Sequence, residues 1–379
     1  MTAPSLLDRV RARLALTEEP PSRAAVAALV REEAGGLLGD DDVLVAVRHA
    51  VDELSGAGPL EPLLRMPGVT DVLVNGPEDV WIDRGEGLER APGVCFEDDE
   101  SVRRLAVRLA GSVGRRLDDA APWVDVGLPH GVRLHAVLPP VSGGGTCLSL
   151  RVLRRRSQAL ADLAATGTLP GESGALVRAV VDRRLAFLVT GGTGSGKTTL
   201  LSALLGEVSP AERLVLCEDA AELLPRHPHV VRLLTRPPNV EGAGGVGLRD
   251  LVRQALRMRP DRLVVGEVRG AEVVDLLSAL NTGHDGGCGT LHANRSAEVP
   301  ARLEALGVAA GLGRAAVHSQ AAAALDVVVH VRRGPAGRRV EEIGVLRRNG
   351  DLVVIEPGWR ADGGPCPAGD ALRLRLAGP

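Results

Sequence analysis

The segment LVTGGTGSGKTTLL, residues 188–201, limits the possible folds of this chain more than any other feature. Gly191 to Thr198 satisfy the pattern GxxxxGKT, with the apolar run LAFLVT before it and the helix-favouring run TTLLSALL after it. A strand, a glycine-rich loop and a helix in this order are typical of a phosphate-binding loop, whereas a flexible turn lacks that context. The segment therefore predicts a phosphate site at the end of a buried strand.

The residues of this loop contribute to binding in different ways. Glycines let backbone N–H groups converge on phosphate oxygens, and the start of the following helix favours negative charge. Lys197 is the only lysine in a chain with 45 Lys and Arg residues. Its slim ammonium reaches β and γ phosphates, where a planar guanidinium does not fit, and the Thr198 hydroxyl is expected to bind Mg²⁺. We therefore expect MgATP to be held by the run Gly191, Gly192, Thr193, Gly194, Ser195, Gly196, Lys197, Thr198 and Thr199.

Two further apolar runs end in carboxylates. In RPDRLVVGEVRG, residues 259–270, the run LVVG ends at Glu267, which we expect to act on the attacking water or on Mg²⁺ through water. The alternative is a solvated charge at the end of a strand. The run RLVLCED ends at Glu218 and Asp219, with Glu222 further along. One interpretation is that these acids orient the water or the metal. The alternative is that Asp219 is the N-cap of a helix whose first turn carries acids.

Two histidines lie in the glycine-rich segment NTGHDGGCGTLHAN, residues 281–294. His284 and His292 are eight positions apart and no further His or Cys ligand stands at a suitable spacing, which argues against zinc. The functional interpretation of His292 is a γ-phosphate contact or a sensor of the nucleotide state. The alternative is a polar histidine whose hydrogen bonds are satisfied within the fold.

Hydrophobic periodicity divides the chain into five segments. Residues 1–55 are predicted to be helical, and residues 56–153 to form a small α+β domain with hairpins around Asn75-Gly76-Pro77 and Pro129-His130-Gly131. Residues 154–174 are expected to be a linker with a short helix. Residues 175–338 alternate strands and helices, which predicts a βαβ core with a largely parallel sheet. Residues 339–379 are expected to be a hairpin turning at Asn349-Gly350 and a tail that is frayed from about Gly363.

Composition restricts the partners. The chain has two Phe, three Trp and no Tyr, and a formal net charge of -3, so it offers few stacking platforms and no global attraction for nucleic acid. Its five cysteines include no CxxC pair, which argues against a disulfide framework and fits a reduced cytosolic compartment. No apolar run approaches the roughly 20 residues of a membrane span. We expect a soluble protein whose association with a membrane depends on a partner.

The ordered set GGTGSGKTTLL, RLVLCEDAAELL, ALRMRPDRLVVGEVRGAE and NTGHDGGCGTLHAN resembles the type II/IV secretion ATPases, and specifically the TadA/CpaF branch with its conjugal transfer-associated members. In that family these segments are the Walker A, Asp, Walker B and His boxes. The resemblance extends over roughly residues 50–335 and includes DVLVNGPEDVWID and LSLRVL.

The resemblance implies a RecA-like P-loop NTPase domain preceded by a smaller α+β domain, with ATP hydrolysed between them. It also implies a homohexameric ring on the cytoplasmic face of an inner-membrane platform, driving pilus assembly, secretion or conjugation-linked transport. Arginines of the N-terminal domain reach the phosphates in such enzymes. The matching positions are Arg133 in HGVRLHA and Arg151 in LSLRVL, with Arg116 as a weaker candidate.

Two other functions are compatible with a phosphate loop. The first is a RecA-like nucleic-acid translocase, in which Arg249, Arg253 and Arg257 meet phosphates, although the same arginines also suit a subunit interface. The second is a nucleotide-gated scaffold that binds ATP without turnover. Aromatic poverty and net charge argue against the first, and Mg²⁺-dependent phosphate release would exclude the second.

Overall fold

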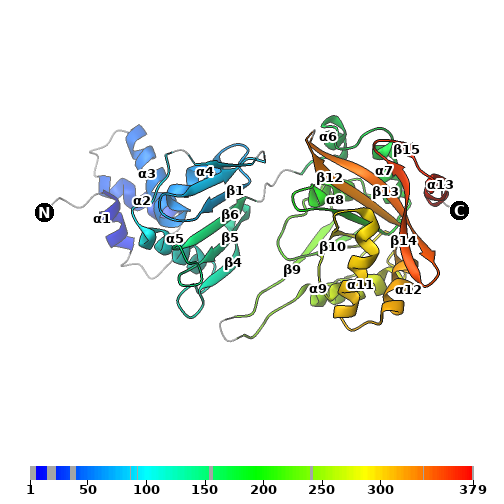
Figure 1. Cartoon of the computed structure of the whole chain (residues 1–379). Helices are drawn as coiled ribbons and strands as arrows, with labels where there is room; N and C mark the ends of the chain where they lie inside the picture. Colours follow the sequence, from blue (N-terminus) through cyan, green and yellow to red (C-terminus); the bar gives the residue numbers. More distant parts are fainter. Residues whose placement is uncertain are drawn as a thin grey trace. The chain divides into compact units, whose positions relative to one another are not determined.

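The protein divides into two compact units, Met1–Arg154 and Arg155–Pro379. Their structure is given by a computed structural model (Figure 1), which describes residues 6–14, 23–34, 40–85, 87–91, 93–152, 157–239, 242–335 and 337–377. Each unit has its own buried core.

The first unit begins with helices at the positions that the apolar spacing predicts. Val10, Val26 and Val30 are fully buried in a small cluster shared by the first three helices, and Arg9 forms an ion pair with Glu33 across it. The helical segments of this unit are α1 (Leu6–Leu14), α2 (Arg23–Ala34), α3 (Asp40–Ser55), η1 (Gly58–Leu60), α4 (Glu61–Arg65), α5 (Asp99–Ser112) and η2 (Pro129–Gly131).

The rest of the first unit is an antiparallel sheet covered by α5. Asp98 caps this helix by accepting a hydrogen bond from the backbone N–H of Ser101 at 2.7 Å, and Leu105 and Leu134 share the core beneath it. Both predicted hairpins are confirmed by the strand pairing. In the described residues the sheet order is β3-β2-β1-β6-β5-β4. The strands are β1 (Asp71–Val74), β2 (Val80–Asp83), β3 (Leu88–Arg90), β4 (Trp123–Leu128), β5 (Val132–Val137) and β6 (Cys147–Val152).

The second unit is built on a longer sheet whose order is β15-β14-β13-β12-β7-β11-β10-β8-β9. Neighbouring strands from β9 to β12 are parallel, and the apolar runs LAFLVT, RLVLCED and LVVG of the sequence lie in this part. The antiparallel strands follow at the β12 side. The strands are β7 (Phe187–Gly191), β8 (Leu214–Glu218), β9 (Val230–Leu234), β10 (Arg262–Val268), β11 (Cys288–His292), β12 (Val327–Gly334), β13 (Gly337–Asn349), β14 (Leu352–Arg360) and β15 (Gly364–Pro365).

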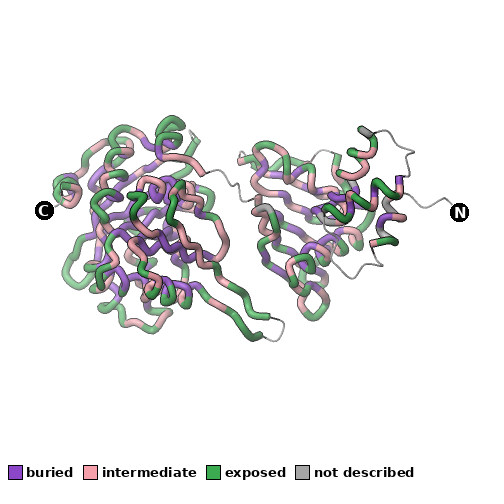
Figure 2. The backbone as a smooth tube through the Cα atoms, turned by 180° about the vertical axis from the view of Figure 1, so that it is seen from behind, coloured by how far each residue is buried: buried purple, intermediate pink, exposed green. Residues whose placement is uncertain are grey.

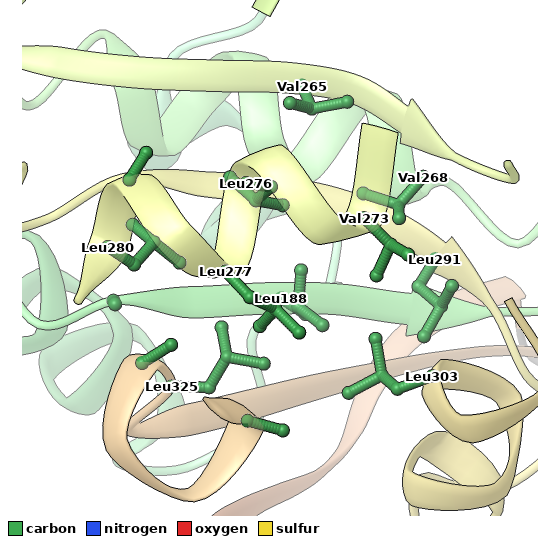
Figure 3. Packing of buried hydrophobic residues seen from close by; sticks show 14 of the residues in the cluster. Leu188, Val265, Val268, Val273, Leu276, Leu277, Leu280, Leu291, Leu303 and Leu325 are labelled. Atoms are coloured by element: carbon green, nitrogen blue, oxygen red, sulfur yellow. The ribbon is translucent and has the colours of Figure 1, made fainter. Parts of the chain in front are cut away.

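Helices cover both faces of this sheet, as a buried parallel sheet requires. Phe187 of β7 faces the cluster that contains α6, α7, α8 and α13, whereas Leu188 faces the cluster that contains α9 to α12 (Figure 3). The helical segments are α6 (Leu160–Ala165), α7 (Ser173–Asp182), α8 (Lys197–Leu205), α9 (Leu248–Ala255), η3 (Leu256–Met258), α10 (Glu272–Leu280), η4 (Ser296–Glu298), α11 (Val299–Ala309), α12 (Arg314–Ala324) and α13 (Gly369–Ala377). No helix among the described ranges is long and apolar enough to cross a membrane.

Two expectations about segment ends differ from the structure. The end of the chain is not frayed from Gly363: β15 pairs with β14, and Leu372 of α13 is 1% exposed. The apolar face of α13 consists only of Leu372 and Leu376, with Arg373 and Arg375 between them in the sequence. Two apolar residues are too few to be recognised as a periodic pattern. The expected linker contains a short helix, α6, but Leu160 and Leu163 are buried in the second unit. Buried backbone, purple in Figure 2, is concentrated in the interior of each unit.

Candidate active site

The phosphate loop joins the end of β7 to the start of α8. Its glycines occupy backbone conformations that other residues rarely adopt, with φ of +70° at Gly194 and +100° at Gly196. At Gly191, φ is +153°, and a side chain there would collide with the carbonyl oxygen of Val331 and with Ser195 Oγ, 2.5 Å from the added Cβ. The glycines therefore shape a tight turn whose backbone N–H groups converge ahead of the helix.

Lys197 lies inside this turn and is 7% exposed. Its ammonium donates to the carbonyl oxygens of Gly191 at 3.1 Å and Gly192 at 2.8 Å, and lies 3.3 Å from His292 Nε2. Burial lowers the pKa of Lys197, while the carboxylates of Glu267 and Glu222 act in the opposite direction. The ammonium is thus held at the loop by carbonyls that phosphate oxygens can replace as its hydrogen-bond acceptors.

The loop fits a polyphosphate. Ser195 Oγ is buried and, among the side chains that the structure describes, belongs to a small group of buried polar atoms without a hydrogen-bond partner. Thr198 and Thr199 are half-buried in the first turn of α8. Within the described ranges, no group of three or more His, Cys, Asp or Glu residues is arranged to hold a metal ion. This donor set fits a metal that binds together with phosphate oxygens, with Thr198 as its protein ligand.

Glu267 and His292 lie beside Lys197 because β7, β11 and β10 are consecutive in the sheet. His292 is in register with Gly191. The pairing of β10 with β11 is irregular between Val265 and Val268, and Glu267 lies within that irregularity. Glu267 Oε1 is 2.8 Å from His292 Nε2. The structure thus brings together three of the predicted site residues.

The protonation of His292 follows from its neighbours. Burial, and then the positive charge of Lys197, lower the pKa of His292, while Glu267 opposes them, so the ring is neutral near pH 7. An ionised carboxylate only accepts hydrogen bonds. Of the two contacts of Nε2, the one with Glu267 is the shorter, which favours the imidazole proton on Nε2, donated to the Glu267 carboxylate and orienting it. The Lys197 ammonium, 3.3 Å from the same nitrogen, then makes no hydrogen bond with it.

Glu218 ends β8, the strand next to β10, but its side chain is occupied within the fold. It is 2% exposed, and Oε1 accepts hydrogen bonds from the N–H groups of Glu222 at 3.0 Å and Leu223 at 2.8 Å. Oε2 accepts from Arg232 Nε at 2.9 Å. Burial raises the pKa of Glu218 against the opposing effect of these donors. Both oxygens are thus used to hold the segment after β8.

The other acids of this segment differ from Glu218. Asp219 forms an ion pair with Arg269 at 2.7 Å and accepts from Thr235 Oγ1 at 3.2 Å. Glu222 is exposed but close enough to Lys197 to act on its pKa. Asp219 does not cap a regular helix, because no helix follows β8 before β9 in the described residues. The N-cap alternative is therefore wrong, and backbone N–H groups are instead bound by Glu218.

His284 is separate from this cluster. Its Nδ1 lies 3.2 Å from the carbonyl oxygen of Ala279 at the end of α10, and β11 begins only at Cys288. The two histidines of the segment therefore have different surroundings, and only His292 contacts Lys197 and Glu267.

Comparison with known proteins identifies the family. The family model described as "Type II/IV secretion system protein" matches residues 53–340, which is more than half of the chain. The chain belongs to the type II/IV secretion system protein family. It is an ATPase, in keeping with the loop, lysine and carboxylate described above.

Two relatives of this secretion-family chain illustrate the range of similarity. "Putative conjugal transfer protein Rv3659c" of Mycobacterium tuberculosis is 62% identical over 335 residues, covering 86% of this chain and 95% of the relative. "Type IV secretion system protein PtlH" of Bordetella pertussis is 33% identical over 334 residues, covering 81% of this chain and 95% of the relative.

Solved structures of other proteins share the fold of this secretion-family ATPase. The pilus retraction motor PilT with bound ADP has a TM-score of 0.52 at 19% identity, covering 82% of this chain and 83% of that one. The Legionella pneumophila ATPase DotB has a TM-score of 0.50 at 19% identity, covering 86% and 82%. At this identity the likeness concerns the fold: an N-terminal domain followed by a RecA-like ATPase domain.

The arginines that the secretion-family resemblance pointed to lie in the first unit. Arg133 of β5 and Arg151 of β6 are directly opposite each other in the sheet, so they share one face. Arg133 binds Asp125 through two contacts of 2.8 Å, and Arg151 binds Asp71 at 2.9 Å. Arg116 pairs with the neighbouring acid of its own turn, Asp118.

The arginines of the translocase hypothesis have partners within the second unit. Arg249 and Arg253 each lie 2.7 Å from the half-buried carboxylate of Asp275 on α10, and Arg257 donates to the backbone of Arg253. Asp275 thus neutralises much of this face, which weakens the case for a surface that attracts phosphates.

Sequence reasoning missed three polar residues that hydrogen-bond to segments of the site. His330 is buried next to β7, with Nδ1 3.0 Å from Thr190 Oγ1. Glu272 is buried and accepts hydrogen bonds from the N–H groups of Arg269 and Gly270. Arg338 Nε donates to the carbonyl oxygen of Gly194 at 3.0 Å. For Arg338, the sequence offered a signal in the arginine cluster RRGPAGRR, residues 332–339.

Proposed function

We propose that this chain is the motor subunit of a conjugal transfer-associated or Tad-type pilus system, within the TadA/CpaF branch, and that it converts hydrolysis of MgATP into domain motion. The observation that carries the proposal is the cluster of Lys197, His292 and Glu267 on three adjacent strands. A scaffold that only binds ATP needs the lysine and the loop. It does not need a carboxylate oriented by a neutral imidazole beside them.

The proposed roles follow from the contacts. Residues 191–199 hold the phosphates, with Lys197 moving its hydrogen bonds from loop carbonyls to phosphate oxygens. Glu267 accepts the proton of the attacking water, and His292 holds the Glu267 carboxylate in place. When bound by Thr198 and by Glu267 through water, Mg²⁺ would neutralise charge on the phosphates.

The acids at the end of β8 and after it take supporting roles in this proposal. Glu218 is a structural acid, because both of its oxygens accept hydrogen bonds from groups of the fold. Asp219 positions Arg269 beside the Glu267 segment. Glu222 is exposed and adds negative potential near Lys197, which suits a group that helps to orient water.

The arginine pair of the first unit is proposed to complete the site across the ring. Arg133 and Arg151 lie side by side on one sheet face. Each is held by a carboxylate, Asp125 or Asp71, in an ion pair that is partly exposed, so the guanidinium groups can exchange these partners for phosphate oxygens. In the proposal they stabilise the charge that develops on the phosphates, in a homohexamer seated on the cytoplasmic face of an inner-membrane platform protein. The names of the relatives support transfer or secretion as the process.

Replacement of the arginine pair tests this assignment. Arg133→Ala and Arg151→Ala are each expected to lower kcat by roughly 10³-fold, because arginines that reach transferred phosphates contribute on this scale. The measurement is phosphate release at saturating MgATP by the full chain, with light scattering to record its oligomeric state.

The matched control is Arg103→Ala, which removes an exposed ion pair with Asp119 from α5 of the same unit and is expected to leave kcat unchanged. If both pair variants retain wild-type turnover in an intact oligomer, the first unit does not supply the phosphate contacts. If the wild-type chain releases no phosphate in any oligomeric state, the motor function itself is wrong.

A further inference from the structure

The four arginines of RRGPAGRR lie at the turn of the β12–β13 hairpin, and the pleat of the strands sorts them into two pairs. Arg332 is opposite Arg339, and Arg333 is opposite Arg338. Because successive side chains alternate between faces, the two pairs lie on opposite faces of the hairpin. The sequence cluster is therefore two separate structural features.

The first pair has carboxylate partners on one face. Arg332 lies 2.9 Å from Glu341, and Arg339 lies 3.0 Å from Asp362. These are exposed ion pairs on the surface of the second unit, and such pairs contribute little to stability.

The second pair meets the phosphate loop. A Cβ added to Gly194 would lie 4.0 Å from a guanidinium nitrogen of Arg333, and one added to Gly196 would lie 3.1 Å from Cδ of Arg338. Arg338 Nε donates to the carbonyl oxygen of Gly194 at 3.0 Å. Two cationic side chains thus approach the loop at Gly194 and Gly196.

The hairpin reaches this position because of strand lengths. β12 pairs with β7 as far as His330 opposite Thr190 and then continues to Gly334. Since the two strands are parallel, the extra residues extend beyond the carboxyl end of β7, where the phosphate loop begins. The collision that a side chain on Gly191 would make with the Val331 carbonyl confirms how closely β12 and the loop approach.

The contact with Gly194 affects the direction of one N–H group. In a trans peptide the carbonyl oxygen and the N–H of the next residue point in opposite directions. When Arg338 holds the Gly194 carbonyl outward, the Ser195 N–H is directed to the inside of the loop. Its present acceptor there is the Gly192 carbonyl at 3.4 Å, a long contact that a phosphate oxygen can readily replace.

We propose that Arg338 is a positioning residue of the nucleotide site: from outside the phosphate loop it holds the Gly194–Ser195 peptide in the orientation that binds phosphate. Arg333 adds positive potential from the facing strand. The inference rests on the proposed function of the loop and adds to it a contact from the carboxyl-terminal part of the chain. Because this contact is made with the loop and not with the reacting atoms, it strengthens ground state and transition state alike.

The test compares Arg338→Ala with Arg339→Ala, which changes the opposite face of the same strand. Arg338→Ala is expected to raise the Kd for a fluorescent ADP analogue, and KM for ATP, by about 3- to 10-fold, while kcat changes by less than about twofold. Arg338→Lys is expected to recover part of the affinity, because an ammonium also donates to a carbonyl. Arg339→Ala is expected to bind like the wild type.

Equilibrium binding of the ADP analogue requires neither turnover nor ring assembly, so it separates this inference from the motor proposal. Lys197→Ala marks the site and is expected to abolish binding.

If the wild type binds the analogue and Arg338→Ala binds it equally or more tightly, Arg338 is not a positioning residue. A loss of kcat at unchanged KM also overturns the inference, because it indicates a contact made only in the transition state. If the wild type itself does not bind, the nucleotide site is wrong. Thermal unfolding of each variant verifies that the fold is intact.

Discussion

Glu218 and Glu267 end neighbouring strands of the same parallel sheet, and their side chains have opposite surroundings. Glu218 is 2% exposed and accepts three hydrogen bonds from Arg232 and from backbone N–H groups. Glu267 has a side chain that is 35% exposed and lies against His292. One carboxylate is saturated by its own fold, and the other keeps an oxygen that can accept a proton from water.

The comparison shows that the position of an acid at the end of a strand does not decide whether it is structural or available for catalysis. Both strands are apolar and both end at the carboxyl edge of the sheet, where ligands of open α/β sheets bind. What separates the two acids is the chain that follows. After Glu218 the backbone folds back over the carboxylate, whereas the irregular pairing of β10 leaves Glu267 beside Lys197. A change at each acid should therefore affect a different property of the protein.

The largest effect is expected for Glu267→Gln. Gln keeps the size of Glu267 but cannot accept a proton from water, so kcat should fall by roughly 10²- to 10⁴-fold. Binding of the ADP analogue and the melting temperature should stay close to wild type, because the side chain is partly exposed. Phosphate release and equilibrium binding measure the two properties. Turnover near the wild-type level in Glu267→Gln would transfer the role of base to another acid, with Glu222 as the first candidate.

A smaller effect, and one on stability, is expected for Glu218→Ala. The substitution leaves the charge of Arg232 and the N–H groups of Glu222 and Leu223 without their acceptor, at a cost of about 3 kcal/mol. Urea unfolding of the second unit measures this loss. Glu267→Ala is the matched control and is expected to cost less than about 1 kcal/mol. Equal losses in the two variants would contradict the distinction between a structural and a catalytic acid.

The smallest effect is a shift in the titration of His292, followed by NMR of labelled histidine. Its pKa lies below the ordinary value in the folded chain, so this group stabilises the fold above about pH 6.5, and that contribution is lost as the pH falls through its folded pKa. Glu267 raises the pKa of His292; hence Glu267→Gln should lower it further. Glu218→Gln should leave it unchanged. A shift in the Glu218 variant, or none in the Glu267 variant, would contradict the described neighbourhood.

Local patterns predicted much of this protein. The loop of residues 191–198, its flanking strand and helix, the six parallel strands and the two hairpins of the first unit follow from glycine placement and hydrophobic periodicity, which depend on neighbours in sequence. Lys197 was also recognised from the sequence, because it lies inside this loop motif. Periodicity failed for α13, where two apolar residues were too few to mark a helix.

Only the tertiary structure decided which polar side chains meet. Lys197, His292 and Glu267 are far apart in sequence and converge because their strands are adjacent in the sheet. Arg338 meets Gly194 across 144 positions because β12 extends beyond β7. The sequence by itself determined a phosphate loop with acids and arginines nearby. Whether each acid is saturated or available depends on hydrogen-bond partners that other strands supply, and this pairing exists only once the sheet has formed.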